Sequence, residues 1–316
     1  MIETRRLRKT YKGRRGAVEA VKGIDLDVKA GEIFGFLGPN GAGKTTTLRM
    51  LATLITPTDG EATVAGVDLR ADPAEVRRRI GYVAQGGSTD PTMTAMQELV
   101  IQARAYGVRK TEAFERAARA IETFELTECA HRKSGTYSGG QKRRLDLAIG
   151  MIHSPQLVFL DEPTTGLDPQ SRAHLWGWVR RLRDEGMTVF LTTHYLDEAD
   201  ALADRIAIID NGEIVAEGTS DELKREIAGD VIELGVSGDQ ARARALLANQ
   251  PYVRDVESGD DGHIRLYVEQ GESAMPRILR LLDGEGLGLD QIGLHRPSLD
   301  DVFLRKTGRS LRDEAA

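Results

Sequence analysis

A glycine-rich run from Gly38 to Thr45, with the letters GPNGAGKT, fits the pattern G-x-x-x-x-G-K-[ST] of a phosphate-binding loop. Glycines let backbone N–H groups wrap a phosphate, and a helix that follows the run points its positive end at the same anion. Lys44 can reach the β- and γ-phosphates of a nucleotide, and the Thr45 hydroxyl can ligate Mg²⁺. The run therefore predicts a nucleoside triphosphate site rather than an ordinary glycine-rich turn before a helix.

Two adjacent carboxylates, Asp161 and Glu162, follow the apolar run Leu157–Leu160. A carboxylate at the end of a buried strand beside a phosphate loop can hold Mg²⁺ directly or through water, and the next one can orient or deprotonate an attacking water. The pair alone would fit a solvated Asp-Glu-Pro turn equally well, but the phosphate loop favours the catalytic interpretation. The guanine-reading pattern Asn/Thr-Lys-x-Asp does not occur in order, which favours adenine.

A third segment, Ser138-Gly139-Gly140-Gln141, opens a helix that we expect to run to about Ile152. Ser138 with Gln141 forms a capping box and two glycines make a loose helix entry, so the segment could be purely structural. Bare N–H groups at a helix N-terminus also suit a γ-phosphate, so the segment could equally be a second anion site. The four residues alone leave both interpretations open.

Short apolar runs alternate with helical patterns over the first 225 residues, which indicates an α/β layer fold. Strands are expected at Ile33–Leu37, Leu157–Leu160, Val189–Thr193 and Arg205–Asp210. A helix is expected from Lys44 to about Leu54. Residues 94–152 are mostly helical and are typical of an insertion into the α/β core; a capping box at Thr94 and Gln97 opens its first helix, and Gly107 closes that helix.

The chain changes character near residue 230. Residues 230–316 carry 11 basic and 16 acidic side chains, whereas residues 1–229 are nearly balanced, with 32 and 33. The later segment has the order β-α-β-β-α-β, the split pattern of a ferredoxin-like α+β unit. Its elements are expected at Val231–Val236, Gln240–Asn249, Tyr252–Glu257, His263–Val268, Met275–Leu282 and Leu287–Leu294, with a turn at Asp260-Asp261-Gly262 and a tail helix at Ser298–Leu304. We therefore expect two domains, 1–225 and 230–316, with a helical part at about 87–150 in the first.

The order and spacing of these segments resemble the ATP-binding cassette (ABC) family over residues 1 to about 225. The resemblance rests on the phosphate loop, the carboxylate pair and the Ser-Gly-Gly-Gln segment, together with Gln85, Asp168 and His194. It implies a P-loop NTPase cassette with an inserted helical subdomain, which binds ATP with Mg²⁺ and hydrolyses the ATP. It also implies a head-to-tail homodimer, in which the Ser-Gly-Gly-Gln segment of one copy completes the site of the other.

The resemblance implies a role for each matching residue. In the catalytic set, Glu162 is the general base, His194 contacts the γ-phosphate and Gln85 senses Mg²⁺ and water. The metal set is Thr45, Gln85 and Asp161. The nucleotide-binding residues that it implies are Tyr11, Gly38, Pro39, Asn40, Gly41, Ala42, Gly43, Lys44, Thr45, Thr46, Ser138, Gly139, Gly140, Gln141 and Asp168.

Among these, Tyr11 matches the aromatic residue that stacks on adenine, and Asp168 matches a loop that crosses the dimer. One position departs from the family, because Tyr137 stands where leucine is usual; tyrosine is familiar there in drug-resistance exporters.

The stretch Arg296–Gly308 resembles the closing motif of the daunorubicin-resistance type of ABC ATPase, which handles drugs and lipids. For the C-terminal unit we hypothesise a regulatory or dimer-steadying role.

Composition limits where this protein can be located in the cell and which kinds of partner it can bind. No run approaches the roughly 20 apolar residues of a membrane span, and no apolar stretch follows Met1, so we expect neither a span nor a secretory signal. The net charge of −6 disfavours non-specific nucleic-acid binding. The one cysteine, Cys129, is too few for a disulfide framework or a multi-cysteine zinc site.

The resemblance thus implies the ATP-hydrolysing subunit of an exporter, at the cytoplasmic face of the cell membrane and without a nucleic-acid partner. It would power efflux of drugs, lipids or other hydrophobic compounds through a separate integral-membrane permease. The alternative is a soluble ABC-type ATPase that acts on nucleic acid or ribosomes. Such proteins usually have a long coiled coil, two cassettes or zinc cysteines, and here only 94 positions separate Lys44 from Ser138. Glu162 argues against a third class, regulators that bind nucleotide without turnover.

Overall fold

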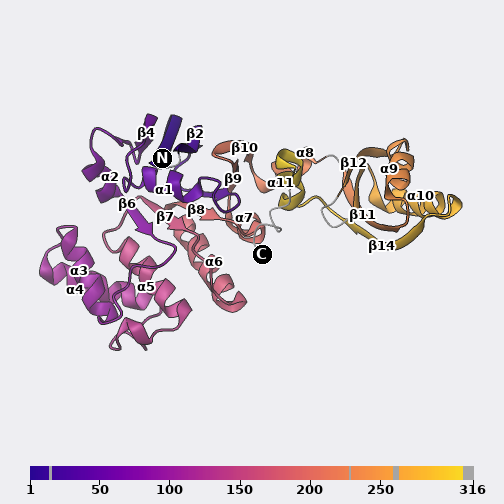
Figure 1. Cartoon of the computed structure of the whole chain (residues 1–316). Coiled ribbons are helices and arrows are strands. Elements are labelled where there is room, and N and C mark those ends of the chain that lie inside the picture. Colours follow the sequence, from indigo (N-terminus) through magenta and orange to yellow (C-terminus); the bar gives the residue numbers. More distant parts are fainter. Residues whose placement is uncertain (14–15, 228, 259–262, 309–316) are drawn as a thin grey trace. The chain divides into compact units, whose positions relative to one another are not determined.

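The computed structural model describes residues 1–13, 16–227, 229–258 and 263–308 (Figure 1). The chain forms two compact units, Met1–Glu217 and Gly218–Ala316. The helix α8 (Ser220–Glu226) precedes the boundary that composition suggests at 225–230, and it lies in the second unit. Each unit has its own buried apolar core.

A six-stranded sheet forms the centre of the first unit, in the order β10-β9-β3-β8-β7-β6. Its strands are β3 (Ile33–Leu37), β6 (Ile80–Val83), β7 (Leu157–Asp161), β8 (Thr188–Thr193), β9 (Arg205–Asp210) and β10 (Glu213–Gly218). All of them except β10 pair in parallel, and β3, β7 and β8 are buried throughout, as strands covered on both faces must be. The sequence predicts four of these strands but misses β6 and β10. Gly81 interrupts the short apolar run of β6, and β10 is only partly buried and carries two glutamates.

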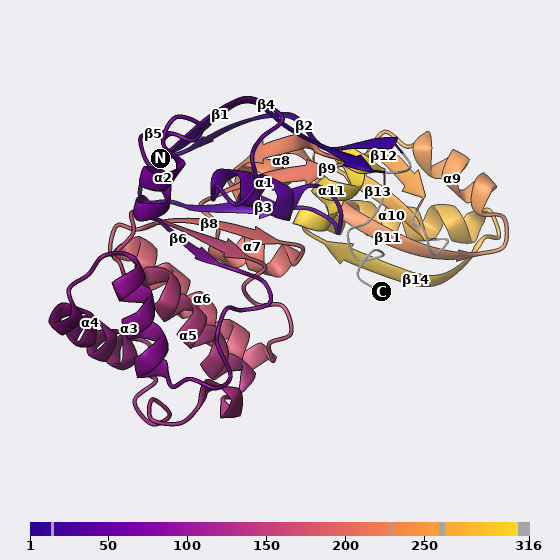
Figure 2. The same cartoon turned by 60° about the vertical axis from the view of Figure 1, so that its left-hand side comes forward.

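A second sheet, antiparallel, has the order β2-β1-β4-β5. Its strands are β1 (Ile2–Gly13), β2 (Gly16–Val28), β4 (Asp59–Val64) and β5 (Val67–Asp68). Helix α1 (Lys44–Leu51) lies between this sheet and the parallel one (Figure 2). The helix ends before the predicted Leu54, because Thr53 adopts a φ of +60°, a left-handed conformation that ends a right-handed helix.

Seven further helical segments complete the first unit: α2 (Pro73–Arg79), α3 (Ala95–Ala105), α4 (Lys110–Thr123), the 3₁₀ helix η1 (Ser134–Thr136), α5 (Gly139–Met151), α6 (Pro169–Asp184) and α7 (Leu196–Leu202). Helices α3, α4 and α5 gather into one group, drawn in magenta in Figure 1, and form the predicted helical insertion. Its first capping box is confirmed: the Thr94 N–H donates to Gln97 Oε1 at 2.9 Å, and the Gln97 N–H donates to Thr94 Oγ1 at 3.3 Å.

The second unit contains an antiparallel sheet in the order β12-β13-β11-β14. Its elements are β11 (Asp230–Ser237), α9 (Gln240–Ala248), β12 (Val253–Ser258), β13 (Ile264–Val268), α10 (Gly271–Gly284) and β14 (Gly288–His295). This is the predicted ferredoxin-like unit. Helix α10 begins before the predicted Met275, because the Asp230 carboxylate accepts the Gly271 N–H at 2.7 Å and anchors an extra turn. The turn predicted at residues 260–262 lies outside the described residues.

The last helix, α11 (Leu299–Thr307), confirms the predicted tail helix and packs against α8. Lys306 Nζ and Glu226 Oε2 form an ion pair at 2.7 Å between the two helices. Ser298 caps α11, accepting the Asp301 N–H at 3.3 Å. Among the described residues, no helix combines the length and the apolar character needed to cross a membrane.

Candidate active site

The carboxyl ends of four parallel strands meet at one edge of the central sheet. Strand β3 leads into the phosphate loop at Gly38, β7 ends at Asp161, β8 leads into His194 and β6 leads towards Gln85. Because β8 pairs with both β3 and β7, and β7 pairs with β6, these distant segments arrive side by side. The strand order therefore assembles one site from four separate parts of the chain.

The phosphate loop, residues 38–45, packs closely on its surroundings and turns into α1. A Cβ at Gly38 would collide with a backbone carbonyl of β9, and Gly43 has a φ of +110°, so both positions require glycine. The Lys44 side chain is buried, and its Nζ donates to the carbonyl oxygens of Gly38 at 2.7 Å and Pro39 at 2.9 Å. The same Nζ lies 3.4 Å from Glu162 Oε1, so the lysine joins the loop to that carboxylate.

Asp161 is buried at the end of β7, between two threonine hydroxyls. Thr45 Oγ1 donates to Asp161 Oδ1 at 3.1 Å, and Thr192 Oγ1 donates to the same oxygen at 2.7 Å. Two members of the predicted metal set, Thr45 and Asp161, are thus in direct contact. The third, Gln85, contacts Glu162 instead.

Glu162 lies at the centre of a polar cluster. Its Oε2 accepts Gln85 Nε2 at 2.7 Å and Thr165 Oγ1 at 3.3 Å, and His194 Nδ1 lies 3.2 Å away. Burial raises the pKa of Glu162, but the contact with His194 and the charge of Lys44 outweigh it, so the pKa falls below its usual value. The carboxylate is therefore ionised at neutral pH and available as a proton acceptor.

The backbone of Glu162 is held in an unusual conformation, with a φ of +43°. A residue with a side chain costs on the order of 1 kcal/mol there, so its surroundings must fix it. The Glu162 N–H donates to both the carbonyl oxygen and the hydroxyl of Thr192, each at 3.1 Å. Strand β8 thereby holds the carboxylate at the edge of the sheet.

The other predicted nucleotide residues near the loop differ in exposure. Ala42 is buried, Thr46 is half-buried on α1, and Asn40 and Gly41 are exposed. Tyr11 lies on β1 of the antiparallel sheet and is 43% exposed, which leaves its ring accessible to a flat partner.

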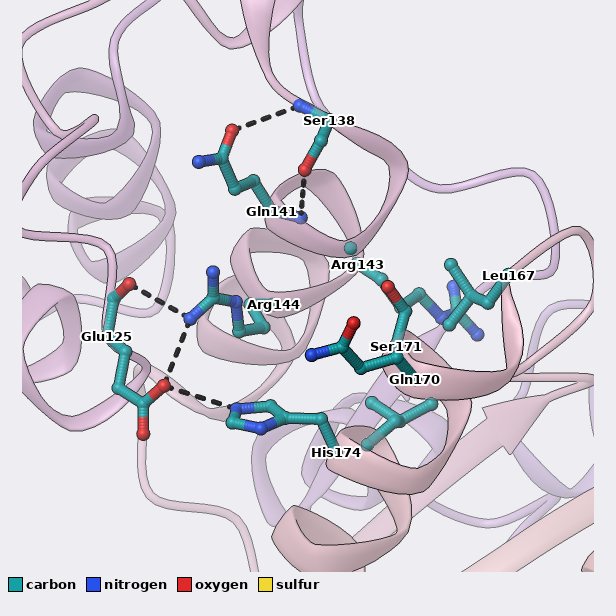
Figure 3. Close-up of a pocket in the computed structure, with 11 residues that line it drawn as sticks. Glu125, Ser138, Gln141, Arg143, Arg144, Leu167, Gln170, Ser171 and His174 are labelled. Carbon is teal, nitrogen blue, oxygen red and sulfur yellow. Dashed lines mark hydrogen bonds and ion pairs between the residues drawn. The ribbon is translucent and has the colours of Figure 1, made fainter.

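A pocket of about 280 Å³ opens at the N-terminus of α5 (Figure 3). The capping box predicted there is confirmed: the Gln141 N–H donates to Ser138 Oγ at 3.3 Å, and the Ser138 N–H donates to Gln141 Oε1 at 3.0 Å. Farther along the wall, Glu125 Oε2 lies 3.2 Å from Arg144 Nη1 and 3.1 Å from His174 Nε2. The lining residues are Glu125, Ser138, Gly140, Gln141, Arg143, Arg144, Leu167, Gln170, Ser171, His174 and Leu175.

Asp168 caps α6 beside this pocket. Its carboxylate accepts the Ser171 N–H at 2.9 Å and the Ser171 hydroxyl at 2.6 Å, and these hydrogen bonds lower the pKa of Asp168. A Cβ on Gly140 would lie 3.1 Å from Ser171 Oγ, so α5 and α6 approach closely here. Gly139 begins α5 next to Ser138. The described residues that line the pocket include none from the phosphate loop.

Comparison with known proteins decides the family. The family described as "ABC transporter" matches residues 21–165, and the one described as "ATP-binding protein DrrA1-3-like, C-terminal domain" matches residues 218–307. The daunorubicin/doxorubicin resistance ATP-binding protein DrrA of Streptomyces peucetius is 46% identical over 316 residues, which cover 99% of this chain and 94% of that protein. The chain belongs to the ABC transporter ATP-binding proteins.

Other relatives of this ABC protein are also matched over nearly their whole length. The linearmycin resistance ATP-binding protein LnrL of Bacillus subtilis is 38% identical, covering 99% of this chain and all of that protein. The Nod factor export ATP-binding protein I of Burkholderia thailandensis is 41% identical, covering 93% of each. Similarity therefore extends over both units and beyond the cassette.

Solved structures agree with the ABC assignment. A dimeric ATP-binding cassette in a post-hydrolysis state, bound to ADP and Pi, has a TM-score of 0.64 at 28% identity and covers 69% of this chain and 98% of that one. An ATP-binding subunit of an ABC transporter has a TM-score of 0.63 at 27% identity, covering 72% and 92%. The chain therefore has the ABC cassette fold and is an ATP-binding, ATP-hydrolysing protein.

Sequence reasoning on this ABC chain misses three residues that shape the site. Thr192 holds Asp161 and Glu162, Thr165 donates to Glu162, and Arg143 bonds the backbone around Glu162. The only local signal is in β8, where Thr192 is one of three buried threonines beside three apolar residues. The other two act through contacts that only the folded chain creates.

Proposed function

We propose that this chain powers the export of drugs, lipids or other hydrophobic compounds through a separate integral-membrane permease, from the cytoplasmic face of the membrane. The observation that carries the proposal is full-length similarity, in both units, to ATP-binding proteins named for drug resistance and export. The alternative, a soluble ABC-type ATPase acting on nucleic acid or ribosomes, is not favoured by these relatives.

In this proposal the phosphate loop and α1 bind the triphosphate of ATP. Lys44 exchanges its contacts with Gly38, Pro39 and Glu162 for the β- and γ-phosphates, to which the loop N–H groups also donate. The exposed Tyr11 ring stacks on adenine. The contacts of Lys44 support its role in binding phosphate. Its buried ammonium already donates to oxygen acceptors, and phosphate oxygens are acceptors of the same kind.

Mg²⁺ fits the pair formed by Thr45 and Asp161. Both supply oxygen, which Mg²⁺ prefers, and adjacent ligands in octahedral coordination lie about 2.9 Å apart, close to the 3.1 Å between Thr45 Oγ1 and Asp161 Oδ1. The ion would neutralise charge on the phosphates. Gln85 joins the metal set only if its side chain leaves Glu162.

Asp161→Asn should raise the Mg²⁺ concentration needed for half-maximal ATP hydrolysis by about tenfold or more, because it removes the charged ligand. The measurement is phosphate release against MgCl₂ at fixed ATP. Asp184→Asn, at the exposed end of α6, serves as the matched control. An unchanged Mg²⁺ dependence in the Asp161 variant would contradict the metal assignment.

Hydrolysis is proposed to use the cluster around Glu162. The ionised carboxylate accepts a proton from the water that attacks the γ-phosphorus, while the phosphorus–oxygen bond to ADP breaks. His194, 3.2 Å from the carboxylate, contacts the γ-phosphate, and Gln85 orients the water. The contacts of Glu162 with both residues support one shared role.

The proposed active form is a homodimer with two shared sites. Ser138, Gly139, Gly140 and Gln141 would face the γ-phosphate of the partner copy's ATP, with Asp168 at the crossing between copies. In support, the α5 N-terminus opens on a pocket of its own, beside which Asp168 caps α6, and the described lining of this pocket lacks the phosphate loop. A head-to-tail pair places each pocket opposite the loop of the other copy.

The permease is proposed to dock on the helical group α3–α5. Three large apolar side chains lie exposed on or just after α3 and on α4: Ile101 at 54%, Tyr106 at 37% and Phe114 at 46%. Exposed apolar side chains of this size suit a hydrophobic partner. The segment that follows Gln85 leads directly into α3, which would connect nucleotide state to the docked permease.

Gln85→Ala should lower permease-dependent transport by at least about tenfold while ATP affinity stays within about twofold, because Gln85 links the hydrolytic cluster to the α3 segment. Transport and fluorescent-nucleotide binding are measured on the co-purified complex in vesicles. Gln291→Ala, exposed in the second unit, is the control. Equal loss of binding and transport would contradict the coupling role.

Co-purification with a multi-span membrane protein tests the proposed function itself. A cysteine placed between Met93 and Met96 should cross-link to the cytoplasmic loops of that protein, and the native Cys129 is buried and interferes little. No cross-link from any position between Gly86 and Ala105 would remove the docking proposal. Co-purification with ribosomes or nucleic acid instead would favour the alternative function.

A further inference from the structure

One arginine on α5 reaches three separate backbone carbonyls of the catalytic edge. Arg143 is 6% exposed; its Nε donates to the Pro163 oxygen at 2.8 Å, its Nη1 to the Ala84 oxygen at 2.7 Å and its Nη2 to the Asp161 oxygen at 3.4 Å. Asp161 and Pro163 flank Glu162 on both sides. The planar guanidinium fork therefore brackets the residue whose φ of +43° needs outside support.

The same arginine also holds the segment that carries Gln85. Ala84 immediately precedes Gln85, and one turn farther along α5 the Asp146 carboxylate accepts the Ser88 N–H at 2.7 Å and the Ser88 hydroxyl at 3.2 Å. Arg143 and Asp146 thus fasten the two ends of the segment around Gln85 to one helix face. Burial lowers the pKa of Arg143, while the charges of Asp146 and other carboxylates oppose this, and a guanidinium stays charged.

We infer that Arg143 is a positioning residue that ties the helix beginning at Ser138 to both Glu162 and Gln85. The inference deepens the proposed function and rests on the role given there to Glu162. Arg143 lies five residues after Ser138 on the same rigid helix. A partner nucleotide that engages the N-terminus of α5 would then act on the hydrolytic carboxylate through a single side chain, without an intervening loop.

Arg143→Lys is the test, because it keeps the buried charge and loses the three-way fork. In the purified full chain we expect kcat for ATP to fall about 10- to 100-fold and KM to change less than about threefold, since a carboxylate displaced by a fraction of an ångström still allows binding. Arg116→Lys is the matched control: Arg116 Nη1 also donates to a backbone carbonyl, that of Ile152 at the C-terminal cap of α5, at 3.4 Å. It should hydrolyse ATP like the wild type.

A second comparison separates positioning from general damage. In a Glu162→Gln background, Arg143→Lys should change the residual turnover by less than about twofold, because its effect passes through Glu162. A full multiplicative loss there, a wild-type kcat in the single variant, or a loss confined to KM would each overturn the inference. If the Arg143→Lys variant fails to fold, Arg143→Gln takes its place in the same measurements. Failure of both variants to fold would also overturn the inference. Undiminished turnover in Glu162→Gln alone would instead refute the proposed role of Glu162.

Discussion

Glu162→Gln should lower ATP turnover by about 10²- to 10⁴-fold while leaving ATP binding intact, the range that loss of a general base produces. The amide has the size of the carboxylate but cannot take a proton from water. It also removes the negative charge that lies 3.4 Å from the buried Lys44 ammonium in the native chain. The phosphates of ATP then become the best available counter-charge, so affinity for ATP should stay equal or rise.

Phosphate release and fluorescent-ATP binding measure the two sides of this expectation. With ATP and Mg²⁺, sedimentation should show the Glu162→Gln chain trapped as a dimer. The ATP-bound dimer should still form, but without ATP hydrolysis its two copies do not separate. Glu185→Gln, exposed at the end of α6, is the isosteric control and should behave as the wild type. Only monomer in the presence of ATP and Mg²⁺ would count heavily against shared sites.

Lys44→Ala is expected to abolish ATP binding or hydrolysis, with affinity falling at least about 100-fold, or about 3 kcal/mol. Two losses combine in this variant. The charge that would offset the triphosphate disappears, and the carbonyl oxygens of Gly38 and Pro39 lose the donor that holds the loop in shape. The side chain is 4% exposed, so water replaces it poorly.

Equilibrium binding of a fluorescent ATP analogue, with thermal melting to check folding, measures the effect of Lys44→Ala. Lys110→Ala, exposed at the start of α4, removes the same charge elsewhere and should change neither quantity. Hydrolysis at the wild-type rate in the Lys44 variant would refute the phosphate-loop assignment.

The elements of this fold that can be predicted from the sequence are those that depend on residues close together in the chain. The phosphate loop can be predicted because two of its positions require glycine for local reasons. Gly38 packs closely against another backbone segment, and Gly43 adopts a positive φ. Strands β3, β7 and β8 can be predicted because burial on both faces gives each of them a run of apolar residues. The capping boxes at Thr94 and Ser138 are readable because both partners lie within four residues.

What the sequence does not reveal depends on segments that meet only after folding. Arg143 is one basic residue among neighbours of the same type, and its three carbonyl partners lie 18 to 59 positions away. The contact of Lys44 with Glu162 likewise needs β3 and β7 to flank β8. Strand β6 escapes notice because a short run broken by Gly81 has no distinct period.

The positive φ of Glu162 links the stability of the fold to its catalytic chemistry. Glycine at position 162 would relieve the backbone strain, on the order of 1 kcal/mol. It would also remove a carboxylate whose ionised form the fold stabilises, because His194 and Lys44 outweigh the effect of burial and lower its pKa. The strained backbone is therefore offset by the contacts of the same residue's side chain, and the two effects of a glycine there oppose each other in the free energy of unfolding.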